Sequence, residues 1–256
     1  MKTKLFFALV LSLACTVLFS QDLSTTASTD ASIKVTTVKP GTGIKPSPGK
    51  EVSFHIVVST PDGDQVFSTQ DMNVPVHETV GEDTDKESVA VYDAMQKSMQ
   101  EGGKYRLEVP KDILRNPKTA DDAGVDYLVY EIYLLDVTDA KPSGAKLLKE
   151  TVSTQGVDAA KAKFDQLRSG QLSGYTLVEW DMNLAGYDLL QANNPDAAIA
   201  LFQMNTQLNP GSWNAYDSLG DAYLAKEDKA NAKASFEKAL KLNPDFAASK
   251  EKLSDL

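Results

Sequence analysis

The C-terminal part of the chain repeats itself at a fixed offset of 34 residues. Four pairs of residues obey this offset: Gly186 and Gly220, Ala198 and Ala232, Phe202 and Phe236, and Pro210 and Pro244. A period of this length is typical of stacked helical hairpins, in which each hairpin buries its apolar face against the next. The feature therefore predicts an all-α repetitive domain over residues 149–256.

The second repeat resembles the tetratricopeptide repeat (TPR). The matching residues are Tyr216, Leu219, Gly220 and Tyr223 in its first helix and Ala232, Phe236, Ala239 and Pro244 in its second. In this pattern the small residues let the two helices approach closely and the proline ends the second helix. We expect repeats near 179–212 and 213–246, a further helix over 158–167 and a capping helix over 247–253.

The TPR resemblance implies a protein partner, because TPR stacks bind peptides or proteins in their concave groove. The alternative is a packing scaffold or a dimer surface, since the matching residues are core positions and indicate no ligand.

The first twenty residues have the pattern of a secretory signal peptide. Lys2 and Lys4 precede a short apolar run, and Ser20 is a small residue at the expected cleavage point. The run is too short for a membrane span. Cys15 leaves lipidation as an alternative, although Ser12 and Leu13 fit the lipoprotein signal poorly. Residues 21–32 are Ser-, Thr- and Asp-rich and predict a flexible tether. We therefore expect a periplasmic or secreted protein.

Composition excludes several classes of function. The 256 residues carry a formal charge of −10, which disfavours binding to nucleic acid. One Cys and two His exclude a Cys/His zinc cluster and a disulfide framework. No nucleophile elbow or Ser/His/Asp arrangement indicates a hydrolase. We therefore expect no metal and no cofactor.

Residues 33–137 have the pattern of an α+β domain. Strands are predicted where apolar residues alternate with polar ones: Val52, Phe54, Ile56 and Val58; Tyr105, Leu107 and Val109; and Leu128, Tyr130, Ile132 and Leu134. Residues 61–64 predict a hairpin turn. Helical spacing places Val89, Tyr92, Met95 and Met99 on one face, and Gly102 and Gly103 end that helix. A linker is expected over 138–148.

This domain resembles the FKBP-type peptidyl-prolyl isomerases. Its ordered local matches are Lys39-Pro40-Gly41-Thr42-Gly43, Pro48-Gly49-Lys50-Glu51-Val52, Phe54-His55-Ile56, Asp62-Gly63 with Val66-Phe67-Ser68-Thr69, Met99-Gln100-Glu101-Gly102, Leu107-Glu108-Val109-Pro110 and the strand 127–135. The resemblance implies a curved antiparallel sheet wrapped around one short helix.

The resemblance also implies isomerisation of X–Pro bonds in unfolded or proline-containing proteins. The barrier to this rotation is about 18–20 kcal/mol, and a dry aromatic pocket favours the twisted transition state without a nucleophile or metal. The family's pocket residues correspond to Phe67, Val89, Tyr92 and Tyr130.

Three substrate-binding positions depart from the family pattern. Ile56 replaces a strand Tyr, Ser68 replaces the Asp after Phe67, and Arg115 stands at or near a Tyr. In the family these groups supply hydrogen bonds to substrate carbonyls. The predicted function is an exported isomerase with a TPR tail. The alternative is a non-catalytic, chaperone-like binding module. The acidic run at 82–87 is interpreted as a solvated loop.

Overall fold

The computed structural model describes residues 33–256, which form two compact units. The first comprises residues 33–71 and 75–140, and the second comprises 72–74 and 141–256. The predicted signal peptide (1–20) and tether (21–32) lie outside the described residues.

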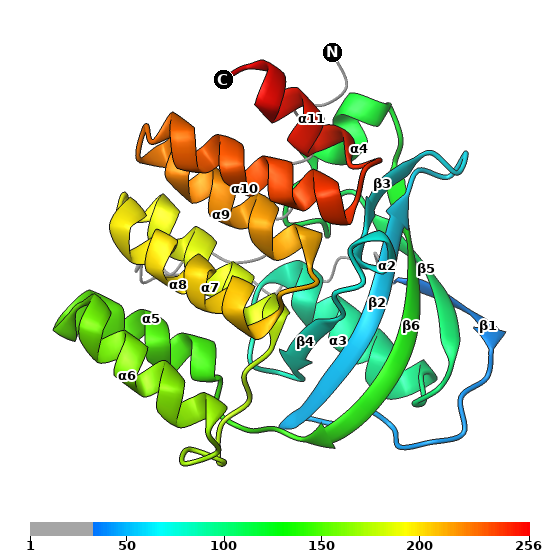
Figure 1. Ribbon diagram of the computed structural model, residues 1–256. Helices are drawn as coiled ribbons and strands as arrows, with labels where there is room; N and C mark the ends of the chain where they lie inside the picture. The colour runs from blue at the N-terminus through cyan, green and yellow to red at the C-terminus, as the bar shows by residue number, and fades with distance from the viewer. Residues whose placement is uncertain (1–32) are drawn as a thin grey trace, which may run out of the picture. The chain divides into compact units, whose positions relative to one another are not determined.

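The first unit is built on a six-stranded antiparallel sheet (Figure 1). The strands run in the order β1–β5–β6–β2–β3, and β4 also pairs with β2. Their bounds are β1 Lys34–Lys39, β2 Lys50–Ser59, β3 Gln65–Ser68, β4 Val76–Thr79, β5 Lys104–Pro110 and β6 Tyr127–Asp139. The helices among them are α2 Thr69–Met72, α3 Lys86–Ser98 and α4 Lys118–Ala123.

The predicted alternation gives this sheet its inner face. Every second residue is buried along β5 and along most of β6, and Val52, Phe54 and Val58 are buried on β2. The hairpin turn at 61–64 is confirmed. The Thr60 carbonyl accepts the Gly63 N–H, and Gly63 has a φ of 96°, which suits glycine.

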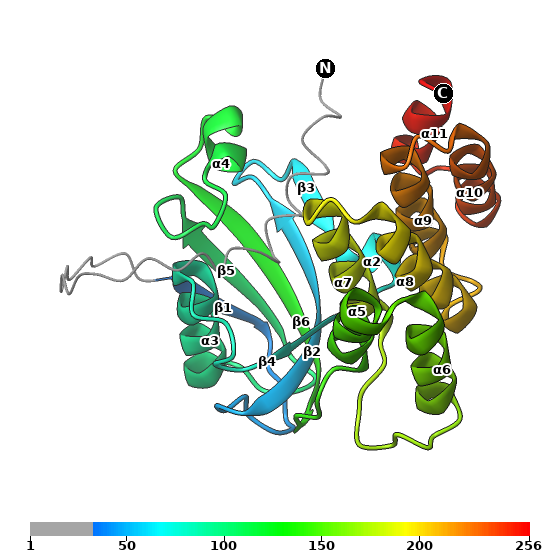
Figure 2. The ribbon, with the colours of Figure 1, turned by 90° about the vertical axis from the view of Figure 1, so that its left-hand side faces the viewer.

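Helix α3 lies on the side toward which the strands curve (Figure 2). Asp85 caps its first turn by accepting the Ser88 N–H, and Ser88, Tyr92, Met95 and Met99 are buried. The predicted helix is therefore confirmed, but Val89 is 51% exposed. The buried face of α3 therefore begins at Ser88, one residue before the predicted Val89.

Two further expectations about this part need correction. The fold was expected to contain one short helix, but α2 and α4 are present as well. Both are too short to show a helical period in the sequence. The linker expected at 138–148 is also shorter, because β6 continues to Asp139 and α5 begins at Gly144. Only residues 140–143 lie between them.

The second unit is a stack of helical hairpins (Figure 1). Its helices are α5 Gly144–Gln155, α6 Val157–Arg168, α7 Glu179–Gln191, α8 Pro195–Leu208, α9 Trp213–Ala225, α10 Lys229–Leu242 and α11 Ala247–Ser254. The predicted helices at 158–167 and 247–253 are confirmed as α6 and α11. Across residues 33–256, no helix combines the length and apolar character needed to cross a membrane.

The repeated glycines hold the paired helices close together. A Cβ atom at Gly186 would lie 2.4 Å from Phe202 Cζ, and one at Gly220 would lie 2.4 Å from Phe236 Cε1. Both phenylalanines are fully buried. The offset of 34 residues therefore repeats one contact, a phenylalanine ring packed against a helix at a position that has no side chain.

We predict that Gly220→Ala destabilises the second unit. Alanine in a helix interior ordinarily adds about 1 kcal/mol of stability relative to glycine. Here its methyl group collides with a buried ring, and overpacking of this kind costs about 1–3 kcal/mol. Denaturant unfolding followed by tryptophan fluorescence measures the effect, because Trp180 and Trp213 both lie in this unit.

Gly211→Ala is the matched control, since nothing lies within 4 Å of a Cβ at that position. Equal stability of the two variants would contradict the proposed role of Gly220.

Candidate functional site

Phe67 and Tyr130 lie in one row across the inner face of the sheet. Val58 on β2 pairs with Phe67 on β3 and with Tyr130 on β6. Directly paired residues of antiparallel strands point to the same face. The two rings are 4% and 8% exposed, so both belong to the core of the domain.

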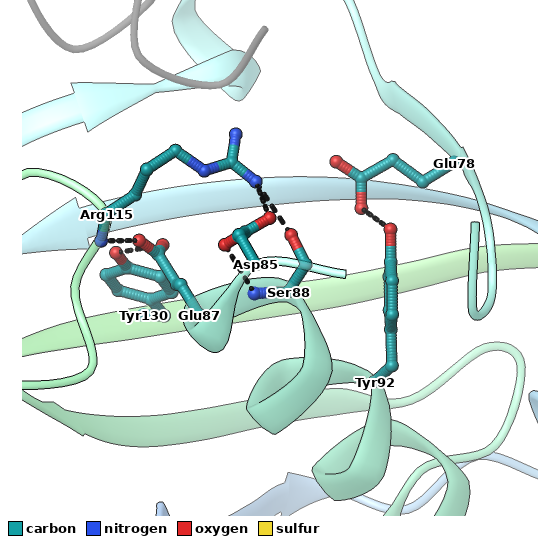
Figure 3. A network of polar contacts seen from close by, with 7 residues as sticks. All are labelled: Glu78, Asp85, Glu87, Ser88, Tyr92, Arg115 and Tyr130. Atoms are coloured by element: carbon teal, nitrogen blue, oxygen red, sulfur yellow. Dashed lines mark hydrogen bonds and ion pairs between the residues drawn. The ribbon is translucent and has the colours of Figure 1, made fainter. Parts of the chain in front are cut away.

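The β5–α4 loop is bonded to the first turn of α3 through Arg115 (Figure 3). Its guanidinium donates to the Asp85 carboxylate and, at 2.7 Å, to Ser88 Oγ. Burial alone would raise the pKa of Asp85, but the hydrogen bonds from Arg115 and Ser88 hold it below its usual value. Arg115 and Asp85 therefore form a partly buried ion pair.

Glu87 joins Tyr130 to the same loop. The Tyr130 hydroxyl donates to Glu87 Oε1 at 2.7 Å, and the Arg115 backbone N–H donates to Glu87 Oε2 at 2.6 Å. Burial and the Glu87 charge raise the pKa of Tyr130 well above its usual value. The hydroxyl therefore keeps its proton and acts as a donor.

Tyr92 extends from the next turn of α3 to strand β4. Its hydroxyl donates to Glu78 Oε2 at 3.1 Å. Burial and the negative charge of Asp83 raise the pKa of Glu78 to about 7, although the bond from Tyr92 acts in the opposite direction. This carboxyl group therefore changes protonation state near neutral pH.

The other three predicted site residues take no part in this network. Val89 lies on α3 and is half exposed. Ile56 is partly buried on β2, and its backbone N–H donates to Thr69 Oγ1 at 2.9 Å. Ser68 is buried, and its hydroxyl oxygen accepts the Asp71 N–H at 3.1 Å. The structure thus joins Tyr130 and Arg115 through Glu87 and sets Phe67 in a row with Tyr130.

The partners of these residues were not predicted from the sequence. The run at 82–87 was interpreted as a solvated loop, but Asp85 caps α3 and pairs with Arg115, and Glu87 makes two hydrogen bonds. An Asp placed three residues before Ser88 at the start of a periodic segment is a helix N-cap signal, which locates Asp85. No pattern in the neighbouring sequence indicates that Asp85 or Glu87 contacts Arg115.

Metal-ligating side chains do not gather in the part of the chain that the structure describes. Among residues 33–256, no group of three or more His, Cys, Asp or Glu side chains could hold a metal ion.

Comparison with known proteins identifies one repeat. A family model described as tetratricopeptide repeat matches residues 214–246. Superkiller complex protein 3 is 32% identical in Homo sapiens and 31% identical in Mus musculus, each over 111 residues. These alignments cover 43% of this chain but only 7% of the relatives' length. The second predicted repeat therefore contains a tetratricopeptide repeat.

Two solved structures are similar to part of the chain. FkpA from Escherichia coli is 20% identical, with a TM-score of 0.34, covering 42% of this chain and 49% of that one. A peptidyl-prolyl cis-trans isomerase from Pseudomonas syringae pv. tomato str. DC3000 is 30% identical, with a TM-score of 0.33, covering 41% and 75%.

We predict that Glu78 makes the first unit less stable as the pH rises from about 4.5 to about 7. In this range the folded protein keeps a proton that the unfolded chain has lost, so the free energy of unfolding falls with pH. Glu78→Gln should remove this slope and stabilise the unit at pH 8 by on the order of 3 kcal/mol. Hydrogen exchange of amides in β5 and β6 measures it.

Tyr92→Phe is the matched variant, because it removes the bond that favours the ionised form of Glu78. Its pH slope should extend above pH 7. The same slope in Glu78→Gln as in the unsubstituted protein would contradict the assignment.

Proposed function

We propose that the protein is an exported peptidyl-prolyl isomerase of FKBP type, with a TPR tail that binds a protein partner. The observation that carries the proposal is the row of Phe67, Val58 and Tyr130 on the inner face of the sheet. Two aromatic residues that the resemblance assigns to the isomerase pocket are thus brought into one row, on either side of Val58, from strands that are far apart in the sequence.

The physical chemistry of the reaction suits this row. Rotation about an X–Pro bond passes through a twisted amide with less charge separation than the planar ground state. Apolar ring faces solvate such a state better than water does, so a surface built from Phe67 and Tyr130 lowers the barrier by binding. Tyr92, which the resemblance also assigns to the pocket, lies one helical turn beyond Ser88, and its hydroxyl is bonded to Glu78.

A second candidate is a module that binds proline-containing chains without isomerising them. One observation favours it: two side chains at substrate-binding positions already have partners within the protein. The Arg115 guanidinium is bonded to Asp85 and Ser88, and Ser68 Oγ accepts the Asp71 N–H. Ile56 carries no polar side-chain group. Fewer groups are then left to hold the substrate carbonyls in the transition state.

The TPR tail supports a role in holding proteins. A tetratricopeptide repeat at 214–246 stacks on a similar hairpin formed by α7 and α8. Such stacks present an extended concave surface to peptides or partner proteins. We propose that the tail recruits a partner while the first unit acts on its proline residues.

We predict that the purified protein catalyses cis–trans exchange of an Ala-Leu-Pro-Phe tetrapeptide. Exchange measured by NMR without a protease reports the rate directly. Phe67→Ala and Tyr130→Ala should each abolish it, because each removes one aromatic wall from the proposed row. Leu135→Ala is the matched control on β6, since this residue is 44% exposed and next to the buried Leu134.

Two results would decide against the isomerase. A folded protein with no rate above background, but with peptide-induced shifts at Phe67 and Tyr130, establishes the binding module instead. Full rates in both alanine variants show that the active surface lies elsewhere.

A further inference from the structure

Glu87 connects two parts of the chain that the FKBP resemblance assigns to one site. One carboxylate oxygen accepts the hydroxyl of Tyr130 from β6, and the other accepts the backbone N–H of Arg115 from the β5–α4 loop. Figure 3 shows the Glu87 carboxylate, at the first turn of α3, bonded to both donors.

Each of the two hydrogen bonds to Glu87 fixes the position of one group. Tyr130 lies on a strand, so its backbone is fixed by the sheet, and the bond to Glu87 fixes the direction of its hydroxyl. Arg115 lies in a loop, and a bond to its backbone fixes the path of the chain there. A single side chain therefore sets the distance between an aromatic wall and the loop that borders it.

We propose that Glu87 is a positioning residue of the isomerase site, which holds the Tyr130 ring and the loop around Arg115 in the arrangement that accepts an X–Pro segment. This inference rests on the proposed function. Glu87 acts through Tyr130 and Arg115 and exchanges no proton or bond with the substrate.

The surrounding contacts separate this role from general stability. Asp85 caps α3, and the Arg115 side chain is bonded to Asp85 and Ser88. The helix and the loop therefore stay joined when Glu87 is removed, since these bonds do not involve it. What is lost is the orientation of the Tyr130 hydroxyl and of the Arg115 N–H. The expected defect is therefore in the site, with the fold retained.

Two variants of Glu87 test the proposal. Glu87→Ala removes both acceptors. Glu87→Gln keeps one acceptor oxygen for the Arg115 N–H and offers an amide N–H to the Tyr130 hydroxyl oxygen, which can also accept. We expect Glu87→Ala to lower kcat/KM for the tetrapeptide by about tenfold or more, because misplacing a site by an ångström costs up to about a hundredfold. Glu87→Gln should restore most of the activity.

Asp93→Ala is the matched control. Asp93 is an exposed carboxylate on the same helix and pairs with Lys97 one turn away, outside the network of Figure 3. It should retain the activity of the unsubstituted protein. Unchanged activity in Glu87→Ala overturns the proposal. Equal loss in Glu87→Ala and Glu87→Gln also overturns it, because the charge rather than the positioning would then be responsible.

A second readout decides the proposal without catalysis. The ring resonances of Tyr130, identified by their loss in Tyr130→Phe, and the amide resonance of Arg115 report the two bonds directly. Both should shift in Glu87→Ala and return in Glu87→Gln. If the unsubstituted protein is inactive, the proposed function fails, while these shifts still establish that Glu87 positions both groups. Resonances unaffected by Glu87→Ala overturn the positioning role whatever the activity.

Discussion

The packing of α3 against the curved sheet is the constraint on which the candidate site depends. Tyr92, Met95 and Met99 bury one side of this helix, and the Asp85 cap fixes where it begins. Once its axis and first residue are set, the side chains of its first turn reach the β5–α4 loop and the end of β6 (Figure 3). Apolar packing therefore brings the groups of the polar network together. This packing stabilises the domain but does not depend on the orientation of the groups, whereas the hydrogen bonds of the network fix the orientation of individual side chains.

Regular patterns made most of the fold predictable. Alternation along β2, β5 and β6 identifies the inner face, and the 34-residue offset identifies the hairpins, because each pattern repeats a contact that every unit must make. Strand β1 is exposed at almost every position, and α4 has six residues, so neither carries a period. The order in which the strands pair follows from long-range packing and is not contained in any single segment.

Some residues of the candidate site could be predicted from the sequence, but their bonding partners could not. The resemblance named Phe67, Tyr92, Tyr130 and Arg115, because these residues follow recognisable strand and helix motifs. Their partners Glu78, Asp85 and Glu87 were not predicted, since carboxylates ordinarily face water. Arg115 and Asp85 are 30 residues apart in the sequence, and only the folded chain brings them together. The patterns that predict helices and strands lie within short segments of the sequence. The charged residues of a site are paired with residues far away in the sequence, so no short segment reveals the pairs.

Arg115, Asp85 and Glu87 form one bonded set at the first turn of α3. A guanidinium at Arg115 without acceptors would be a partly buried, unpaired charge, and carboxylates at Asp85 and Glu87 without donors would be equally costly. The partial burial of each of these charged residues is therefore tolerated only because its partners are present. On the sheet side, Ile56 offers no side-chain donor and the Ser68 oxygen is engaged with Asp71. At the three substrate-binding positions the side chains are therefore apolar, as at Ile56, or already bonded within the protein, as at Ser68 and Arg115.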